Sequence, residues 1–230
     1  MRELFVLSAG AAKAVVMSLK AGFEREEGVA LRTTFGAVGA MRDQWAAGTP
    51  CDVLILSAKL LDDLAGDGAI DARVALGRVR TGVAVPSGSV LPPIADGYEL
   101  RRAFLAATSL YLPDPQRATA GIHCVEVLQR LGIADAMQPR LRRFPNGAAA
   151  MAGLATAVEE RAIGCTQVTE ILYTPGVTLV GALPAGFELN TEYAAAVVAR
   201  AREATLARSF VARLGGDGTL ATRRAGGFEV

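Results

Sequence analysis

The sequence predicts an α/β protein with mixed, mostly parallel sheets. Segments with the apolar patterns of strands and of helices alternate almost throughout, which places helices on both faces of a mostly parallel sheet. Residues 53–56 read Val-Leu-Ile-Leu, a continuous apolar run typical of a central parallel strand. The 230 residues are 51% hydrophobic and 20% charged, which is enough apolar material for one large domain or two lobes.

The N-terminal segment is the clearest example of this alternation. A buried strand at 4–7 runs into a loop of small residues at 8–12, and the helix that follows carries Val16, Leu19 and Phe23 on one face. Small residues let a ligand approach the backbone. The N–H groups of the first helical turn then face that ligand, together with the positive end of the helix dipole. Such a turn binds an anion without a charged side chain, and it lacks the spacing of a phosphate-binding loop.

Three further turns, at 35–41, 113–123 and 145–147, repeat this arrangement of strand, small residues and helix. The carboxyl ends of parallel strands lie at one edge of a sheet, where ligands bind. Short connections often use such residues without binding anything, but four of them together favour a shared anion site. The candidate ligand-binding residues in these turns are Ser8, Gly10, Ala11, Lys13, Gly36, Ala37, Val38, Arg117, Thr119, Ala120, Gly121, Asn146 and Gly147. The side chains of Lys13 and Arg117 could equally be solvated.

The rest of the chain continues the alternation. The helix after the third turn should bury the face that carries Ile122, Val125, Leu128 and Leu131, and Met41 with Trp45 should belong to the core. Residues 86–93 have the composition of a loop. We expect further strands at 79–85, 109–112, 163–168, 177–180 and 192–198, and helices at 148–158 and 203–214.

Charge and composition exclude several classes of partner. The net charge is +1 and basic residues are spread along the chain, so we expect neither nucleic acid nor an anionic membrane surface as a partner. No apolar run approaches the ~20 residues that span a bilayer, so no membrane insertion is expected. We expect a monomer whose partner is a small anionic ligand.

Cysteine and histidine usage predicts neither a metal nor a cofactor. Cys51, Cys124 and Cys165 have spacings that match no metal site, and the chain contains one histidine. Their apolar or small neighbours indicate buried, reduced thiols. A strand follows Met-Arg-Glu directly, without an apolar leader. This start predicts a cytoplasmic protein, or a periplasmic one if a signal peptide has been removed.

Four segments, in this order, resemble the periplasmic molybdate-binding protein family, a branch of the type 2 solute-binding fold. They are the first strand-loop-helix, the run Ala-Gly-Thr-Pro-Cys-Asp-Val-Leu-Ile at 47–55, and the segments 114–122 and 164–170. The resemblance covers nearly the whole chain. It implies two α/β lobes joined by two crossing strands, with the ligand clamped between the lobes.

The same resemblance implies where the lobes divide. The crossings would lie near 80–85 and 186–193. Lobe one is then expected at 1–81 plus 188–230, and lobe two at 82–187.

Three positions depart from the pattern of the molybdate binders, which hold the oxyanion with the hydroxyl groups of two loop serines and a tyrosine. The aligned positions here carry Ala11, Val38 and Gln167. The loss of three hydroxyl donors predicts weak or absent molybdate binding. The sequence is more similar to a divergent branch that includes aconitate isomerase-like enzymes, which interconvert cis- and trans-aconitate. The marks of this branch lie at 8–11, 80–85, 119–123, 167–172 and 175–177.

Five residues outside the small-residue stretches of the turns are further candidates. Arg80 lies in a predicted strand and could bind a carboxylate with two hydrogen bonds, or be an ordinary edge-strand residue. Gln167 and Tyr193 could donate hydrogen bonds to ligand oxygens, or pack. His123 and Glu170 could move protons. Alternatively, His123 is a partly buried helix residue bonded to a carbonyl, and Glu170 caps a helix or pairs with an arginine.

The predicted function is therefore that of a solute-binding protein that clamps a small anion, an organic carboxylate rather than molybdate, between two lobes. An exported protein of this kind would pair with an ABC-transporter permease. The alternative is an isomerase of an unsaturated tricarboxylic acid in the same cleft. Such an enzyme would use His123 or Glu170 as the base, and the backbone donors would stabilise the carbanion.

Overall fold

The computed structural model describes residues 2–230, and the chain separates into two compact units. Unit 1 comprises Met1–Val79 and Thr191–Val230, and unit 2 comprises Arg80–Asn190. The sequence-based expectation was 1–81 plus 188–230 for one lobe and 82–187 for the other. Both units combine parallel and antiparallel strand pairs, so the predicted α/β class with mixed sheets is confirmed.

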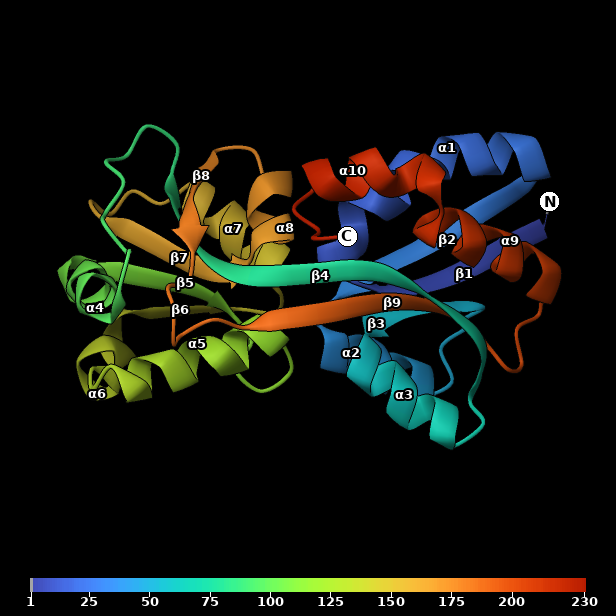
Figure 1. The fold of residues 1–230 in the computed structure, drawn as a ribbon, viewed down its shortest axis with the longest axis horizontal. Coiled ribbons are helices and arrows are strands. Elements are labelled where there is room, and N and C mark those ends of the chain that lie inside the picture. The colour runs from blue at the N-terminus through green and yellow to red at the C-terminus, as the bar shows by residue number, and fades with distance from the viewer. Residues whose placement is uncertain (1) are drawn as a thin grey trace. The chain divides into compact units, whose positions relative to one another are not determined.

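Unit 1 is built on a sheet with helices on both faces. Strand β1 (Arg2–Ala9) pairs in parallel with β2 (Val29–Gly36) and β3 (Val53–Ser57), and β3 pairs antiparallel with β9 (Asn190–Val198). Figure 1 shows helices on both faces of this sheet. On one face lie α1 (Lys13–Glu27), α9 (Ala204–Gly215) and α10 (Leu220–Ala225), and on the other α2 (Val38–Ala46) and α3 (Ala58–Gly66).

The core of unit 1 follows the apolar pattern of the sequence. The run at 53–56 is fully buried in the middle of the sheet, as a central strand should be. Phe23 of α1 packs edge-to-face on Phe210 of α9, with ring centroids 4.9 Å apart. Met41 is buried, and Trp45 is partly buried against the same core, so both belong to the core as predicted.

Unit 2 has a second sheet with a separate apolar cluster on each face. Its strands are the later part of β4 (Ile70–Pro86), β5 (Ser109–Pro113), β6 (Leu141–Phe144), β7 (Ala162–Gln167) and β8 (Val177–Ala182). Strand β5 pairs in parallel with β6 and β7, whereas β4 pairs antiparallel with β7 and β8. On one face lie α4 (Gly97–Ala106), α5 (Thr119–Arg130) and α6 (Ala134–Met137), and on the other α7 (Gly147–Ala155) and α8 (Val168–Tyr173) (Figure 1).

Three expectations about single elements are wrong. Strand β4 begins at Ile70, well before the predicted strand at 79–85, because exposed polar residues in its first half give no apolar signal. Helix α7 ends at Ala155 rather than at 158, where the hydroxyl of Thr156 donates to the last carbonyls of the helix. Helix α5 buries Cys124, Val127 and Leu128, whereas Ile122 is 40% exposed. A strict three-residue spacing drifts around a helix that has 3.6 residues per turn.

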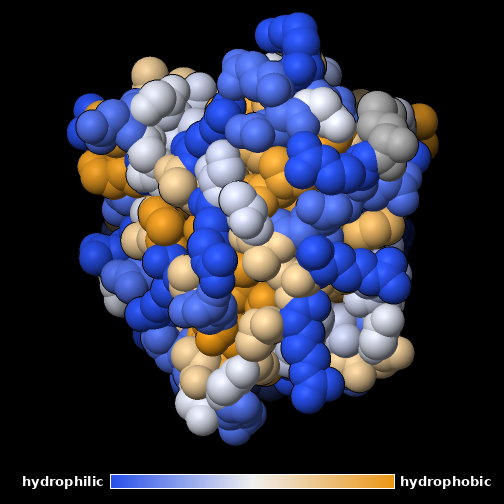
Figure 2. Space-filling model, turned by 90° about the vertical axis from the view of Figure 1, so that its right-hand side faces the viewer, coloured by the Kyte–Doolittle hydropathy of each residue, from blue (hydrophilic) through white to orange (hydrophobic). Residues whose placement is uncertain are grey.

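The surface matches the mixed composition of the sequence. On the face drawn in Figure 2, hydrophilic residues prevail and apolar residues form small patches among them. Among residues 2–230, no helix combines the length and the apolar character needed to cross a membrane.

Candidate functional site

Unit 1 brings two of the predicted turns together at the carboxyl ends of neighbouring strands. Strands β1 and β2 are parallel and in register, so Ala9 lies opposite Gly36. The loop 10–12 and the start of α2 therefore emerge side by side. The side chain of Ser8 is buried, and its hydroxyl donates to the carbonyl of Ala9 at 2.9 Å. The Ser8 hydroxyl is therefore already hydrogen-bonded at the end of β1. The backbone N–H groups of the loop remain as donors for a ligand.

Both helices at this edge begin after an alanine. Gly10–Ala12 form a short 3-10 turn, and Ala12 is the N-cap of α1. Ala37 is the N-cap of α2, which begins at Val38. A methyl group cannot accept a hydrogen bond, so no cap side chain takes the first-turn N–H groups, although the N–H of Lys13 in α1 donates to the carbonyl of Gly10. Lys13 lies 5.8 Å from the centre of the Phe35 ring.

Unit 2 presents a third helix of the same kind. Helix α5 begins at Thr119 after Ala118, which again cannot cap it. Its first turn lies directly on the end of β5, because a Cβ on Gly121 would sit 2.4 Å from the carbonyl oxygens of both Pro113 and Asp114. Only glycine allows this approach, which fixes the N–H groups of α5 at the sheet edge.

Replacing Gly121 with alanine is expected to lower the free energy of unfolding by about 1–3 kcal/mol. The added methyl group meets main-chain oxygens, which cannot move aside as a flexible side chain does. Urea unfolding followed by circular dichroism measures the change. Gly22→Ala is the control, because it lies within α1, where an added Cβ would meet only Oε1 of Glu26 at 3.9 Å, and it should be neutral or stabilising. A Gly121→Ala protein as stable as its parent would contradict the close approach.

The fourth predicted turn differs from the other three, because the protein fills it with its own groups. The side chain of Asn146 caps α7 by accepting from the N–H of Ala149 at 2.9 Å. The carboxylate of Glu170 lies against the same helix end, because a Cβ on Gly147 would sit 1.8 Å from its Oε2. A role of Asn146 and Gly147 in ligand binding stays a prediction.

Glu170 is buried at the start of α8, 7% exposed. Its carboxylate accepts from the hydroxyl of Thr166 at 2.6 Å. Burial raises the pKa of Glu170 above its ordinary value, although hydrogen bonding pulls the pKa down. The roles of Glu170 as a helix cap and as a base stay predictions.

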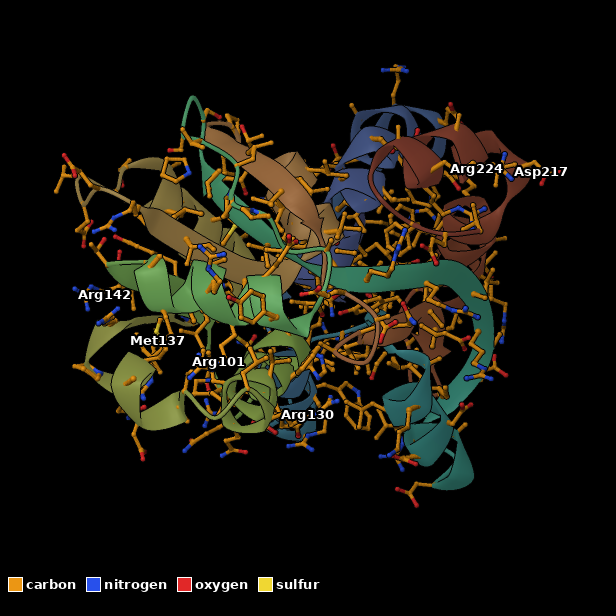
Figure 3. All side chains as sticks on the ribbon, turned by 60° about the vertical axis from the view of Figure 1, so that its left-hand side comes forward. Arg101, Arg130, Met137, Arg142, Asp217 and Arg224 are labelled. Carbon is orange, nitrogen blue, oxygen red and sulfur yellow. The ribbon has the colours of Figure 1, made fainter. Side chains whose placement is uncertain are left out.

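His123 contacts the main chain of a distant segment. Its ring is buried, and Nε2 donates to the carbonyl of Phe187 at 2.8 Å. Nδ1 lies 3.6 Å from the carboxylate of Glu126. Arg130 of α5, labelled in Figure 3, donates to the carbonyl of Gly186 and stacks on the Phe187 ring at 4.7 Å. This geometry matches the structural alternative, a helix histidine bonded to a carbonyl; its role as a base remains a prediction.

The remaining candidates occupy varied environments. Arg80 is exposed in β4, rather than embedded among buried residues as its apolar neighbours suggested, because strand alternation turns it away from Val79 and Thr81. Arg117 is also exposed. Gln167 is 3% exposed at the end of β7, where it lies opposite Thr81 of β4. In unit 1, Tyr193 lies opposite Ser57, and its buried ring packs on Phe228.

The sequence reasoning missed Thr166, the hydroxyl donor to Glu170, and the structural role of Asp52. Asp52 belongs to the Ala-Gly-x-Pro-x-Asp run and is 1% exposed. Its two carboxylate oxygens accept from the backbone N–H groups of Phe5, Arg202 and Glu203.

The cysteines form no cross-links. All three are free; Cys124 and Cys165 are buried as predicted, whereas Cys51 is only partly buried. Burial raises the pKa of the Cys51 thiol to about 12, so this thiol stays protonated near neutral pH. Within residues 2–230, no group of three or more acidic, histidine or cysteine side chains is arranged to hold a metal ion.

Two α/β units between which the chain crosses twice, with helix N-termini at the carboxyl ends of parallel strands, define the class of two-lobed solute-binding proteins. The chain belongs to the family of bacterial extracellular solute-binding proteins, whose sequence profile matches residues 4–229.

Individual relatives support this assignment. An aconitate isomerase of Pseudomonas sp. is 26% identical over 218 residues, which cover 90% of this chain and 80% of the relative. The molybdate-binding protein ModA of Escherichia coli (strain K12) is 27% identical over 209 residues, which cover 89% of this chain and 80% of the relative. The solved structure of the Azotobacter vinelandii periplasmic molybdate-binding protein has a TM-score of 0.80 at 20% identity and covers 99% of both chains. The type 2 solute-binding fold and the resemblance on which it was predicted are thereby confirmed.

Proposed function

We propose that this chain binds a small organic anion that carries carboxylate groups, using backbone donors at the starts of its helices. Membership of the solute-binding family supports a small solute as the ligand. The observation that carries the proposal is the alanine before each of α1, α2 and α5, namely Ala12, Ala37 and Ala118. The first-turn N–H groups of these helices lack a capping side chain at that position and carry the positive end of the helix dipole, which suits an anion.

The side chains beside these donors favour a carboxylate over a tetrahedral oxyanion. Ala11 and Val38 are buried and have no hydroxyl group, and Gln167 stands where the resemblance places a tyrosine. Backbone N–H groups can still hold a planar carboxylate, and the exposed guanidinium of Arg80 can add a bidentate contact. The similarity to an aconitate isomerase, whose substrate is a tricarboxylate, supports the same ligand class.

The first test is a ligand screen. We expect citrate, cis-aconitate or trans-aconitate to raise the melting temperature, and molybdate and tungstate to raise it little or not at all. A ligand at about 100 times its Kd stabilises the fold by ~2.7 kcal/mol, which a thermal shift detects.

Calorimetry should show that Arg80→Ala weakens carboxylate binding by about ten- to a hundredfold.

The control for the Arg80→Ala variant is Arg102→Ala. Arg102 is an exposed arginine of α4 in the same unit, and its guanidinium lies 5.7 Å from the centre of the Tyr98 ring. This variant should bind as the parent does. Submicromolar molybdate binding by the parent would contradict the proposed ligand class. Unchanged carboxylate binding by Arg80→Ala would restrict Arg80 to a structural role.

A second candidate function is isomerisation of an unsaturated tricarboxylic acid, which the similarity to the aconitate isomerase favours. In this function the donors that bind the ligand would also stabilise the carbanion formed when a proton is removed. For the binding function, an ABC-transporter permease is the partner that we propose for an exported, periplasmic protein. A cytoplasmic protein would instead favour the enzyme.

A further inference from the structure

We propose that unit 2 carries a separate site for an apolar α-amino acid, whose side chain enters an apolar pocket and whose two charged groups pair with Arg161 and Glu160. The pocket has a volume of about 510 Å³, within the range of ~300–1,000 Å³ that is typical of small-molecule sites. It lies at the amino ends of β5 and β7, at the opposite edge of the sheet from the start of α5. The inference goes beyond the proposed function and does not depend on it.

The floor of this pocket belongs to the core of unit 2. Val85 of β4, Ala107 and Ile163 of β7 line it, and each of them is at most 4% exposed. All three belong to the apolar cluster that packs under α4 and α5. Ala103 and Ala106 of α4 form one wall, and their small side chains leave the space open. An apolar group that enters the pocket therefore leaves water and contacts the core directly.

The opposite wall comes from the loop 87–96, which connects β4 to α4 (Figure 1). The loop begins with a hydrogen-bonded turn, in which the N–H of Ser89 donates to the carbonyl of Pro86 at 3.1 Å. Val90 follows this turn and lines the pocket, although its side chain is 91% exposed. An apolar side chain that packs on so little of the protein is available to cover an apolar ligand.

The rim of the pocket carries one cation and one anion at adjacent positions. Arg161 and Glu160 both line the pocket, and both are exposed. Arg161 has a φ of 59°, and it is the one non-glycine residue with a positive φ among residues 2–230. This conformation is costly for a residue with a Cβ and persists only where the surroundings impose it.

Thr108 imposes that conformation through two hydrogen bonds. Its hydroxyl donates to the carbonyl of Glu160, and its N–H donates to the carbonyl of Arg161 at 3.3 Å. The backbone that carries the two charged side chains is therefore fixed against the start of β5. A strained backbone that holds a charge pair at the mouth of a pocket is typical of a ligand site.

An α-amino acid matches both charges and the pocket. Its carboxylate can accept two parallel hydrogen bonds from the guanidinium of Arg161, and its ammonium group can donate to the carboxylate of Glu160. A simple monocarboxylate would bring its charge beside Glu160 without compensation. A peptide presents only one of the two charges at each of its ends. A free amino acid with a large hydrocarbon side chain therefore fits the lining best.

Calorimetry with L-phenylalanine tests the two charge pairs separately. Arg161→Gly, which adopts the same φ without strain, should weaken phenylalanine binding by about three- to tenfold. It should leave the affinity for phenylalaninamide, which lacks the carboxylate, unchanged. Glu160→Gln should weaken phenylalanine binding by a similar factor and leave the affinity for N-acetylphenylalanine, which lacks the ammonium group, unchanged.

A third variant tests the pocket itself. Ala106→Phe places a ring in the pocket from an exposed position of α4, so it should lower the affinity for phenylalanine by about tenfold or more. Ala152→Phe, at an exposed position of α7, is the matched control and should bind as the parent does. Saturating citrate should not displace phenylalanine, because the two ligands would occupy different sites.

Circular dichroism establishes that each variant is folded. A parent that does not bind phenylalanine, or a folded Ala106→Phe variant that binds it as the parent does, would overturn the proposal. So would two rim variants with unchanged affinity, and these surface variants decide the question if Ala106→Phe does not fold. Displacement by citrate would also overturn it. Failure of the proposed function is recognised separately, by a parent that binds no di- or tricarboxylate.

Discussion

Replacing Asp52 with alanine is expected to lower the free energy of unfolding by about 3–5 kcal/mol. One carboxylate oxygen accepts from the N–H of Phe5 at 2.9 Å, and the other accepts from the N–H of Arg202 at 2.7 Å. A third N–H, that of Glu203, lies at 3.3 Å. One buried side chain thus ties β1 to the segment that leads into α9, and alanine would leave these donors without an acceptor. Equilibrium unfolding in urea measures the loss.

Asp43→Ala is the matched control. Asp43 lies on α2 and pairs with Arg42 at the surface, so its loss should change the free energy of unfolding by no more than about 0.5 kcal/mol. Asp52→Asn should fall between the two variants, because its amide retains one acceptor oxygen. A loss below about 1 kcal/mol for Asp52→Ala would show that water or a backbone shift satisfies the orphaned donors.

The second large effect concerns the candidate isomerase. If the chain turns over cis-aconitate in deuterated water, trans-aconitate should carry deuterium where the exchanged proton entered. Replacing the base with glutamine, in Glu170→Gln or in His123→Gln, should then lower kcat by about 10²–10⁴-fold, the contribution of one acid–base group. Glu170 already accepts from the hydroxyl of Thr166 and His123 already donates to the carbonyl of Phe187, so the variant of the residue that is not the base should have the smaller effect. Nuclear magnetic resonance follows both the conversion and the label.

Each outcome of this exchange experiment either identifies the residue that acts as the base or excludes the isomerase function. A large loss of turnover in His123→Gln, with Glu170→Gln unaffected, would make the histidine the base. A variant that binds the substrate as tightly as the parent but has a lower kcat would show that the replaced group acts mainly in the transition state. If the parent leaves every unsaturated di- and tricarboxylate unchanged, only the binding function remains.

Local patterns were sufficient to predict the four strand-to-helix turns. Each turn depends on small residues and on apolar periodicity within about a dozen positions, and such signals can be read directly. Helices α2, α5 and α7 begin within the predicted turns, and α1 begins directly after the predicted loop at 8–12. The central strand at 53–56 could be predicted equally well, because a strand that is buried on both faces has an uninterrupted apolar run.

Contacts between distant segments were not predictable from these patterns. His123 is bonded to a carbonyl 64 positions away, and Asp52 accepts from N–H groups about 150 positions away. Glu170 reaches Gly147 across helix α7, one loop and strand β7. Nothing in the residues around 147 indicates that a carboxylate lies against this helix end.

The division into two units gives each half of the molecule its own intrinsic spectroscopic reporter. The only tryptophan, Trp45, lies against the core of unit 1, and the only histidine, His123, is held within unit 2. Indole fluorescence therefore follows one unit and the imidazole proton resonance follows the other, without any label. Coincident denaturation curves from the two probes would mean that both halves lose structure in a single cooperative step.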